Sequence, residues 1–304
     1  MNYPKKLMEF EKQFATDEQC RNYLFELRYQ EGFICPKCGF NKAWYTNRGK
    51  YQCQSCGKDT SVLVGTIFQD THTPLTIWFR AIWYVVSQKQ GANALGLQRI
   101  LGLGSYQTAW TMLHKLRRAM VRPGRDKLQG RIEIDETYIG SVTKTSKTGR
   151  GSERKVLIAI AVEINDKKIG RIRLKLIDNA SAEQLHTFVE EVAEKGSTII
   201  TDGWASYGGL TSKGYSHEVF IGKQTDVENL LPHVHTTASL LKRWILGTFQ
   251  GSCSHEHFAY YLDEYTFRYN RRKSKSRGLL FQRLLENAVQ VTPTTYKQLI
   301  DTHK

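Results

Sequence analysis

Two short apolar segments, each interrupted or followed by an aspartate, constrain the fold of this chain more than any other feature. The first spans Arg131–Ile139, and its alternation places Glu133 and Asp135 on one face and isoleucines on the other. The second spans residues 197–201 and ends directly before Asp202. Both segments are predicted to be β-strands, so the fold needs a sheet that brings these distant strands together.

The segments between and after this pair complete an α/β pattern. Two further strands and a helix are predicted between them, at residues 156–164, 170–177 and 182–195. The first of these strands is apolar almost throughout, which is typical of a central strand buried on both faces. Two more helices are predicted at residues 237–246 and 257–271. The order βββαβα predicts a ribonuclease-H-like core with a mixed sheet over residues 130–285, followed by a tail over residues 286–304.

Such a core would hold Asp135 and Asp202 next to each other, and we predict that both are catalytic and bind magnesium or manganese. Two carboxylates on neighbouring strands can bridge two Mg²⁺ or Mn²⁺ ions. One ion activates water or a 3′-hydroxyl, and the other stabilises the leaving oxygen of an in-line phosphoryl displacement. Aspartates also cap turns and strand ends, so this interpretation depends on the predicted strands.

Four cysteines form two closely spaced pairs separated by fourteen residues, namely Cys35, Cys38, Cys53 and Cys56. Four thiolates make a closed tetrahedral zinc site, which is structural because no position is left for water. The alternatives are chance pairs or a redox dithiol, and the paired spacing disfavours both. We therefore predict a zinc ribbon over residues 29–70, preceded by a helical segment over residues 1–28.

Residues 74–122 are predicted to form a helical DNA-binding segment. Helices are expected at residues 75–87, 91–101 and 106–121, with Ser105 capping the last and a glycine turn before it. Two short helices joined by such a turn are typical of a helix-turn-helix, whose second helix enters the major groove. We expect its first residues to face the bases and later cations to contact the backbone: Tyr106, Gln107 and Thr108, and Lys115, Arg117 and Arg118. The alternative is a helical connector with a solvated basic end.

The charge balance indicates a polyanionic partner. The 304 residues include 44 Lys and Arg against 29 Asp and Glu, a formal net charge of +15, and neutralising phosphates releases counterions. No segment has the pattern of a membrane span or a signal peptide, and the cysteine spacing suits a reducing compartment. We expect a cytoplasmic, nucleoid-associated protein that contacts DNA and no membrane. We further expect a homo-oligomer on the DNA.

A second basic group follows the last predicted core helix, where cations alternate with aromatics over residues 267–277. Arg271 and Arg272 are expected to bind the DNA backbone. Tyr269 either stacks on an unpaired base or belongs to the core. We favour a mixed outcome, in which the aromatics are buried and the cations bind phosphates.

Several motifs together resemble one known family. They are Ile-Glu-Ile-Asp-Glu-Thr-Tyr-Ile-Gly at 132–140, Thr-Asp-Gly-Trp-Ala-Ser-Tyr at 201–207, His-Val-His at 233–235, Leu-Lys-Arg-Trp-Ile-Leu-Gly-Thr at 241–248 and Tyr-Leu-Asp-Glu-Tyr-Thr-Phe-Arg-Tyr-Asn-Arg-Arg at 261–272. The chain resembles insertion-sequence transposases of the IS1595 type, which carry an ISXO2-like transposase domain behind a transposase zinc ribbon. The resemblance implies a recombinase that binds terminal inverted repeats, cleaves DNA and transfers strands by a cut-and-paste or copy-out pathway.

The resemblance also implies an Asp-Asp-Asn or Asp-Asp-Glu metal triad, and Asp135 and Asp202 match its first two members. The third should lie in a segment that is Ser-Asn-Leu-Lys in relatives and Ser-Leu-Leu-Lys at 239–242 here, with Leu240 at the critical position. Leucine cannot ligate a metal, and no carboxylate or amide lies one helical turn away. We expect two aspartates and water to hold the metals, weak or absent cleavage, and recovery in Leu240→Asn or Leu240→Glu. His235 is the next candidate, although it lies about 140° around the helix from Leu240.

These observations favour a DNA transposase, with Lys242 and Arg243 near the scissile phosphate. The main alternative is a transposase-derived protein that binds DNA without cleaving it, which Leu240 favours. A zinc-ribbon transcription factor is a weaker alternative, because it would not need the aspartate pair. If recognition lies in the ribbon and the helix-turn-helix, a fragment ending at Arg122 should keep the sequence preference.

Overall fold

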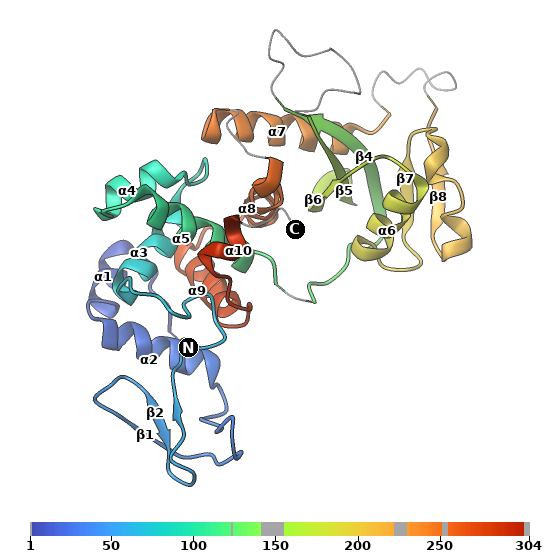
Figure 1. Ribbon diagram of the computed structural model, residues 1–304. Coiled ribbons are helices and arrows are strands. Elements are labelled where there is room, and N and C mark those ends of the chain that lie inside the picture. Colours follow the sequence, from blue (N-terminus) through green and yellow to red (C-terminus); the bar gives the residue numbers. More distant parts are fainter. Residues whose placement is uncertain (1, 123, 141–154, 222–229, 251–254, 301–304) are drawn as a thin grey trace. The chain divides into compact units, whose positions relative to one another are not determined.

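The computed structural model describes residues 2–122, 124–140, 155–221, 230–250 and 255–300. The chain forms two compact units (Figure 1). The N-terminal unit comprises Met1–Pro123 together with Ser274–Lys304, and the second unit comprises Gly124–Lys273. Among the described helices, none has both the length and the apolar character needed to cross a membrane.

The N-terminal unit is mainly helical. Its helices are α1 (Leu7–Gln13), α2 (Asp17–Arg28), α3 (Leu75–Ser87), α4 (Ala94–Leu101), α5 (Tyr106–Ala119), α9 (Arg277–Ala288) and α10 (Tyr296–Ile300). The expected N-terminal helical segment is two helices, because Thr16 begins a new one. Its side chain accepts a hydrogen bond from the backbone of Gln19, and the Gln19 side chain bonds back to the Thr16 backbone. Helices α3 and α5 begin where the sequence predicts.

Helix α9 belongs to the N-terminal unit, although the predicted core over residues 130–285 included most of it. The boundary lies between Lys273 and Ser274. The physical reason is an aromatic cluster, in which the fully buried Phe281 ring lies 5.3–5.7 Å from four others: Phe10, Phe14, Phe79 and Trp83. Helix α9 thus completes an aromatic core whose other rings come from residues 10–83.

The zinc ribbon is a three-stranded antiparallel sheet in the same unit. Its strands are β1 (Ala43–Tyr45), β2 (Tyr51–Cys53) and β3 (Asp59–Thr60), in the order β1-β2-β3. Tyr51 stacks on Phe25 of α2 with ring centroids 4.1 Å apart, and Arg28 donates to the carbonyl of Val62 at 2.8 Å. These contacts fix the ribbon to α2.

The second unit is built on a mixed sheet, as predicted, and this sheet has five strands. Its strands are β4 (Arg131–Ile139), β5 (Val156–Asn165), β6 (Lys168–Ile177), β7 (Thr198–Thr201) and β8 (Ser216–Val219), in the order β6-β5-β4-β7-β8. The pairs β6–β5 and β5–β4 are antiparallel, and the pairs β4–β7 and β7–β8 are parallel. Strand β8 was not predicted, because its four residues carry no apolar alternation.

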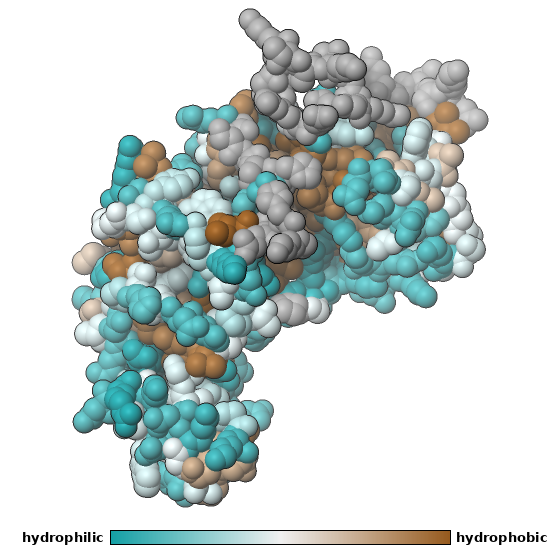
Figure 2. All heavy atoms as spheres, in the orientation of Figure 1, coloured by the Kyte–Doolittle hydropathy of each residue, from teal (hydrophilic) through white to brown (hydrophobic). Residues whose placement is uncertain are grey.

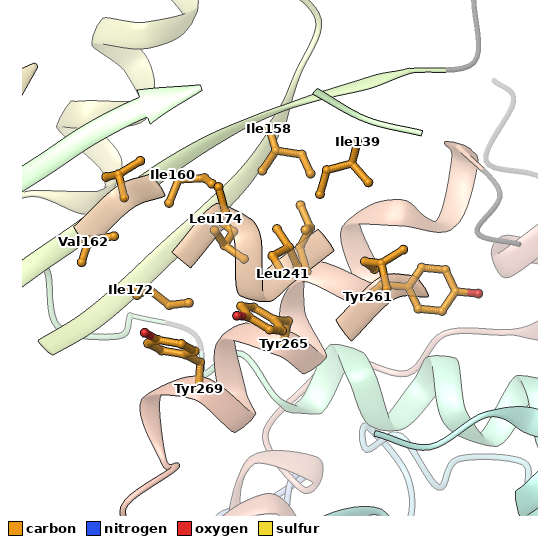
Figure 3. Packing of buried hydrophobic residues seen from close by; sticks show 14 of the residues in the cluster. Ile139, Ile158, Ile160, Val162, Ile172, Leu174, Leu241, Tyr261, Tyr265 and Tyr269 are labelled. Carbon is orange, nitrogen blue, oxygen red and sulfur yellow. The ribbon is translucent and has the colours of Figure 1, made fainter. Parts of the chain in front are cut away.

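Helices cover both faces of this sheet. Helix α6 (Ala182–Val192) packs on one face, and α7 (Pro232–Phe249) and α8 (Phe258–Asn270) pack on the other, where Figure 3 shows part of the apolar cluster. Successive residues of β5, such as Ile158 and Ala159, enter opposite clusters and are fully buried, as expected of a central strand. Short 3-10 helices complete the unit: Ala205–Tyr207 (η1), Thr211–Lys213 (η2) and His255–His257 (η3).

Candidate functional site

The sheet brings the two predicted carboxylates together. Strand β4 pairs in parallel with β7, and the last aligned residues are Glu133 and Ile200. Continuing this register by two positions places Asp135 level with Asp202. Burial raises the pKa of the Asp135 carboxyl, and the charge of Asp202 raises it further, whereas the Glu136 amide and His235 lower it. The two carboxylates are therefore electrostatic neighbours.

Helix α7 adds an imidazole to this pair. His235 lies with its Nε2 3.2 Å from Oδ2 of Asp135, and half of its side chain is exposed. From the sequence, the third ligand was expected at position 240, and His235 was predicted to point away from that position. In the structure, Leu240 packs against the apolar cluster between the sheet and α7 and α8. The polar side chain of α7 that meets Asp135 is His235, five residues earlier.

The position of His235 follows from a buried carboxylate on β4. Glu133 is 3% exposed and accepts hydrogen bonds from the backbone amides of His233 and Val234, each at 2.9 Å. It also contacts Nδ1 of His233 at 2.6 Å. A carboxylate at a helix N-terminus satisfies free amides and complements the helix dipole. Glu133 therefore anchors the start of α7 two residues before His235.

A second link fixes the loop that carries Asp202. Tyr207 of η1 is fully buried and donates its hydroxyl to Oε1 of Glu136 at 2.5 Å. Burial raises the pKa of Glu136 to about 7, and the charges of Asp135 and Asp202 add to this shift against the effect of the Tyr207 hydrogen bond. Both residues belong to the motifs at 132–140 and 201–207, but no role was predicted for either of them from the sequence. The pair joins β4 to the segment after β7.

Asp202 itself is oriented by its own loop. The backbone amide of Trp204 donates to Oδ1 of Asp202 at 3.0 Å, and the Trp204 indole donates to the carbonyl of Ala180 at 3.2 Å. One carboxylate oxygen thus accepts a backbone hydrogen bond. The two carboxylates provide the oxygen donors that Mg²⁺ and Mn²⁺ prefer in proteins.

The four predicted zinc ligands converge. Their sulfur atoms all lie within 4.8 Å of one another, and in the described part of the chain no other group of three or more metal-type ligands is this close. The Sγ atoms of Cys35 and Cys56 are 3.6 Å apart, as are those of Cys38 and Cys53. Four sulfurs at this spacing fit a closed tetrahedral zinc site.

Replacing Cys38 by serine is expected to abolish stoichiometric zinc binding and to destabilise the ribbon, because the ion supplies stability that so small a sheet lacks. Elemental analysis of protein purified without chelator should give about one zinc per wild-type chain. Ser55→Ala is the control and should keep the metal, because Ser55 is an exposed residue between the two cysteines of the second pair. Zinc-free wild-type protein would contradict the assignment.

Three helices, α3, α4 and α5, form in the segment over residues 74–122. The Ser105 side chain accepts from the Gln107 amide at 3.1 Å and caps α5, and Gly102 after α4 adopts the left-handed conformation with φ of 62°. Tyr106 is 53% exposed. Gln107, Thr108 and Lys115 line a cavity of about 250 Å³ together with Trp78 and Tyr296.

The three cations predicted on α5 have different environments. Arg117 is 2% exposed and donates through Nη2 to the carbonyl of Ala92 at 3.0 Å. Its guanidinium therefore ties α5 to the chain before α4, and this burial does not favour the DNA contact predicted for Arg117. Arg118 stays partly exposed, and burial lowers the pKa of the half-buried Lys115.

The predicted DNA-binding cations of the second unit also differ in their environments. Lys242 and Arg243 are exposed on α7. Arg272 lies over the Tyr269 ring at 4.2 Å and donates to the carbonyls of Gly170 and Ile169 at 3.3 and 2.5 Å, so it connects α8 to β6 and its predicted phosphate contact is not favoured.

The aromatics beside these cations are core residues. Tyr269 is 9% exposed and Phe267 is 4% exposed, which confirms the expected burial and leaves no ring face of Tyr269 for base stacking. Arg271 is half-buried and lies over the Phe267 ring at 4.1 Å. Lys242 and Arg243 stay our predicted DNA contacts in this unit.

Comparison with known proteins gives two family matches. Residues 127–270 match the ISXO2-like transposase domain, and residues 15–59 match the transposase zinc-ribbon domain. A curated relative is named as an uncharacterized protein in the transposable element ISH50 of Halobacterium salinarum. It is 24% identical over 254 residues, which cover 77% of this chain and 85% of the relative.

Solved structures to which the chain is similar include an integrase domain and a transposase complex. The catalytic core domain of BIV integrase is 16% identical, with a TM-score of 0.33, over 49% of this chain and 89% of that one. A Mos1 transposase paired-end complex with the left transposon end is 12% identical, with a TM-score of 0.31, over 70% and 79%. The two family matches carry the assignment and together span more than half of the sequence. The chain therefore belongs to the IS1595-type insertion-sequence transposases, with a transposase zinc ribbon ahead of an ISXO2-like transposase domain.

Proposed function

We propose that this protein binds the terminal inverted repeats of its insertion sequence and catalyses metal-dependent DNA strand cleavage and strand transfer. The observation that carries the proposal is that Asp135 on β4 lies beside Asp202, which directly follows the adjacent parallel strand β7. Two neighbouring carboxylates suit metal-dependent phosphoryl transfer on a polyanion, and the net charge of +15 favours such a substrate.

Asp135 and Asp202 would hold Mg²⁺ or Mn²⁺, and His235 is our candidate for a third protein ligand because it contacts Asp135. When bound, the metal would activate the attacking hydroxyl and stabilise the leaving oxygen. The protein positions the donors. Glu133 anchors α7 so that His235 faces Asp135, and the Glu136–Tyr207 hydrogen bond holds the Asp202 loop against β4.

DNA positioning is assigned to exposed cations and to the helix-turn-helix. Lys242 and Arg243 on α7 would contact phosphates near the scissile bond, and the N-terminal residues of α5 would read the repeats. We propose that the protein acts as a homo-oligomer on DNA in the cytoplasm, in association with the nucleoid. Both transposon ends and the target DNA are its partners.

The purified full chain should cleave labelled DNA that carries the inverted repeat of its own element, with Mg²⁺ or Mn²⁺. DNA of equal length with a scrambled repeat is the control and should stay intact. Strand transfer is read by joining of the labelled end to a supercoiled plasmid. Specific binding without cleavage would instead support the alternative favoured by Leu240, a transposase-derived DNA-binding protein.

The third ligand can be identified by metal binding rather than by activity alone. His235→Ala is expected to weaken Mn²⁺ affinity at least about tenfold, measured by calorimetry or electron paramagnetic resonance, because a donor beside Asp135 is lost. Leu240→Asn is the matched change on the same helix and should leave Mn²⁺ affinity unchanged. Tighter binding and restored cleavage in Leu240→Asn, with no effect of His235→Ala, would place the third ligand at position 240.

A further inference from the structure

One face of the zinc ribbon points away from the side that packs on α2, and this face carries the exposed Trp44. Trp44 is directly opposite Gln52 in the antiparallel pair β1–β2, so their side chains share a face. The ladder continues in both directions, because the Gln54 amide donates to the Lys42 carbonyl at 3.1 Å and the Thr46 amide donates to the Lys50 carbonyl at 2.9 Å. By strand alternation, Lys42 and Lys50 lie on the same face as Trp44. We call Lys42, Trp44, Lys50 and Gln52 the ribbon face.

The opposite face of the hairpin is already occupied. It carries Tyr51, which stacks on Phe25 of α2, and Cys53, which is buried at the zinc site. The hairpin tip also lies close to α2, since a side chain at Gly49 would approach the Arg21 guanidinium to 3.2 Å. The packing therefore leaves the ribbon face, and not its reverse, available to a partner.

Trp44 is the feature that needs an explanation. It is 59% exposed, and in the described part of the chain its ring stacks on no other aromatic ring, unlike Tyr45 on the same strand, which contacts Tyr51. Figure 2 shows that the part of the unit holding β1 and β2 is largely hydrophilic, with only scattered hydrophobic residues. Single exposed apolar residues are common, so exposure alone decides nothing.

Charge distinguishes the possible partners. Residues 33–60 contain five Lys and Arg and a single carboxylate, Asp59, and both lysines of the ribbon face are exposed. A second copy of this basic chain would meet charge repulsion there. An indole between ammonium groups and an amide is the chemistry of single-stranded nucleic acid binding, in which bases stack on aromatics and cations hold the backbone.

We propose that the ribbon face binds unpaired nucleotides at the ends of the element, with Trp44 stacked on a base and Lys42 and Lys50 on the flanking phosphates. The proposal deepens the proposed function and rests on it for the identity of the DNA. Inside a duplex, base faces are covered by their neighbours, so stacking requires an unpaired or opened nucleotide. The ribbon then distinguishes an opened or cleaved end from intact duplex, whereas α5 reads sequence.

The test compares two DNA probes of one sequence, a blunt duplex and a duplex with a single-stranded overhang, by fluorescence anisotropy with the full chain. Trp44→Ala is expected to weaken overhang binding about tenfold, with little effect on the blunt duplex. Trp44→Phe should restore most of the loss, because it keeps a stacking ring. Lys42→Gln with Lys50→Gln should reduce the salt slope by about 1.4 on the overhang.

Met8→Ala, an exposed apolar truncation on α1 of the same unit, is the control and should change neither probe. Zinc content and thermal unfolding must match wild type in every variant. Unchanged overhang binding in Trp44→Ala, or an equal loss on both probes, would overturn the proposal, and an altered oligomeric state with unchanged DNA binding would assign the face to a second copy. Because these probes need no cleavage, a chain that fails to cut its element ends but shows this pattern would refute the proposed function alone.

Discussion

Asparagine in place of Asp202 is expected to lower DNA strand cleavage at least about a thousandfold, while leaving the fold and DNA binding intact. The change removes a negative charge from the pair that would hold the metal. It preserves the local hydrogen bond, because the amide oxygen of asparagine can accept from the Trp204 backbone as Oδ1 of Asp202 does at 3.0 Å. The loss should therefore be chemical and not structural.

The measurement is single-turnover cleavage of the inverted-repeat DNA, with binding followed in parallel by anisotropy. Glu191→Gln is the matched control, since it makes the same chemical change on α6 in the same unit. Its side chain is half exposed and paired with Lys175, and an exposed ion pair contributes little. Asp135→Asn should reproduce the defect. Wild-type cleavage by either aspartate variant would remove that carboxylate from the mechanism.

Much of the second unit can be predicted from sequence, because its strands alternate or are uniformly apolar. The Arg131–Ile139 strand is found with its predicted bounds, and the position of Asp202 directly after β7 follows from the end of an apolar run. Strand β8 escapes prediction because Ser216–Val219 is short, edge-placed and polar. A strand of that kind is formed by its neighbour rather than by its own pattern.

The remaining differences concern residues whose environment depends on distant segments. Arg117 has the sequence context of a DNA-binding cation, but the carbonyl that it binds belongs to Ala92, 25 positions earlier. His235 meets Asp135 because Glu133, on a strand 100 positions away from His233, anchors the start of α7. No local periodicity reports such contacts, so sequence could suggest His235 as a ligand but not place it.

The fragment of residues 1–122 illustrates the same limit. From sequence, this fragment should keep the sequence preference of the protein. The structure predicts instead that it will not fold, because α9 supplies the fully buried Phe281 to the aromatic core of the N-terminal unit. Helix α9 packs against α2, α3 and α5. DNA recognition should thus require the last segment of the chain as well as the first.

Phe281→Ala in the full chain is expected to destabilise the N-terminal unit by about 3–5 kcal/mol, because it leaves a cavity among four aromatic rings. Hydrogen exchange at the amides of α3 measures this directly, and β5 serves as the internal reference in the other unit. Arg283→Ala, on the same helix, removes only an exposed ion pair with Glu286 and should change exchange little.

Joining residues 1–122 to residues 274–304 through a flexible glycine-serine linker should restore a cooperative unfolding transition and DNA binding that residues 1–122 lack. The comparison separates folding from recognition, since both fragments carry the ribbon and α5. Cooperative unfolding and specific DNA binding by residues 1–122 alone would show that the N-terminal core tolerates the loss of α9. The second unit would then follow an N-terminal region that folds by itself, and it would not be an insertion within a single folded domain.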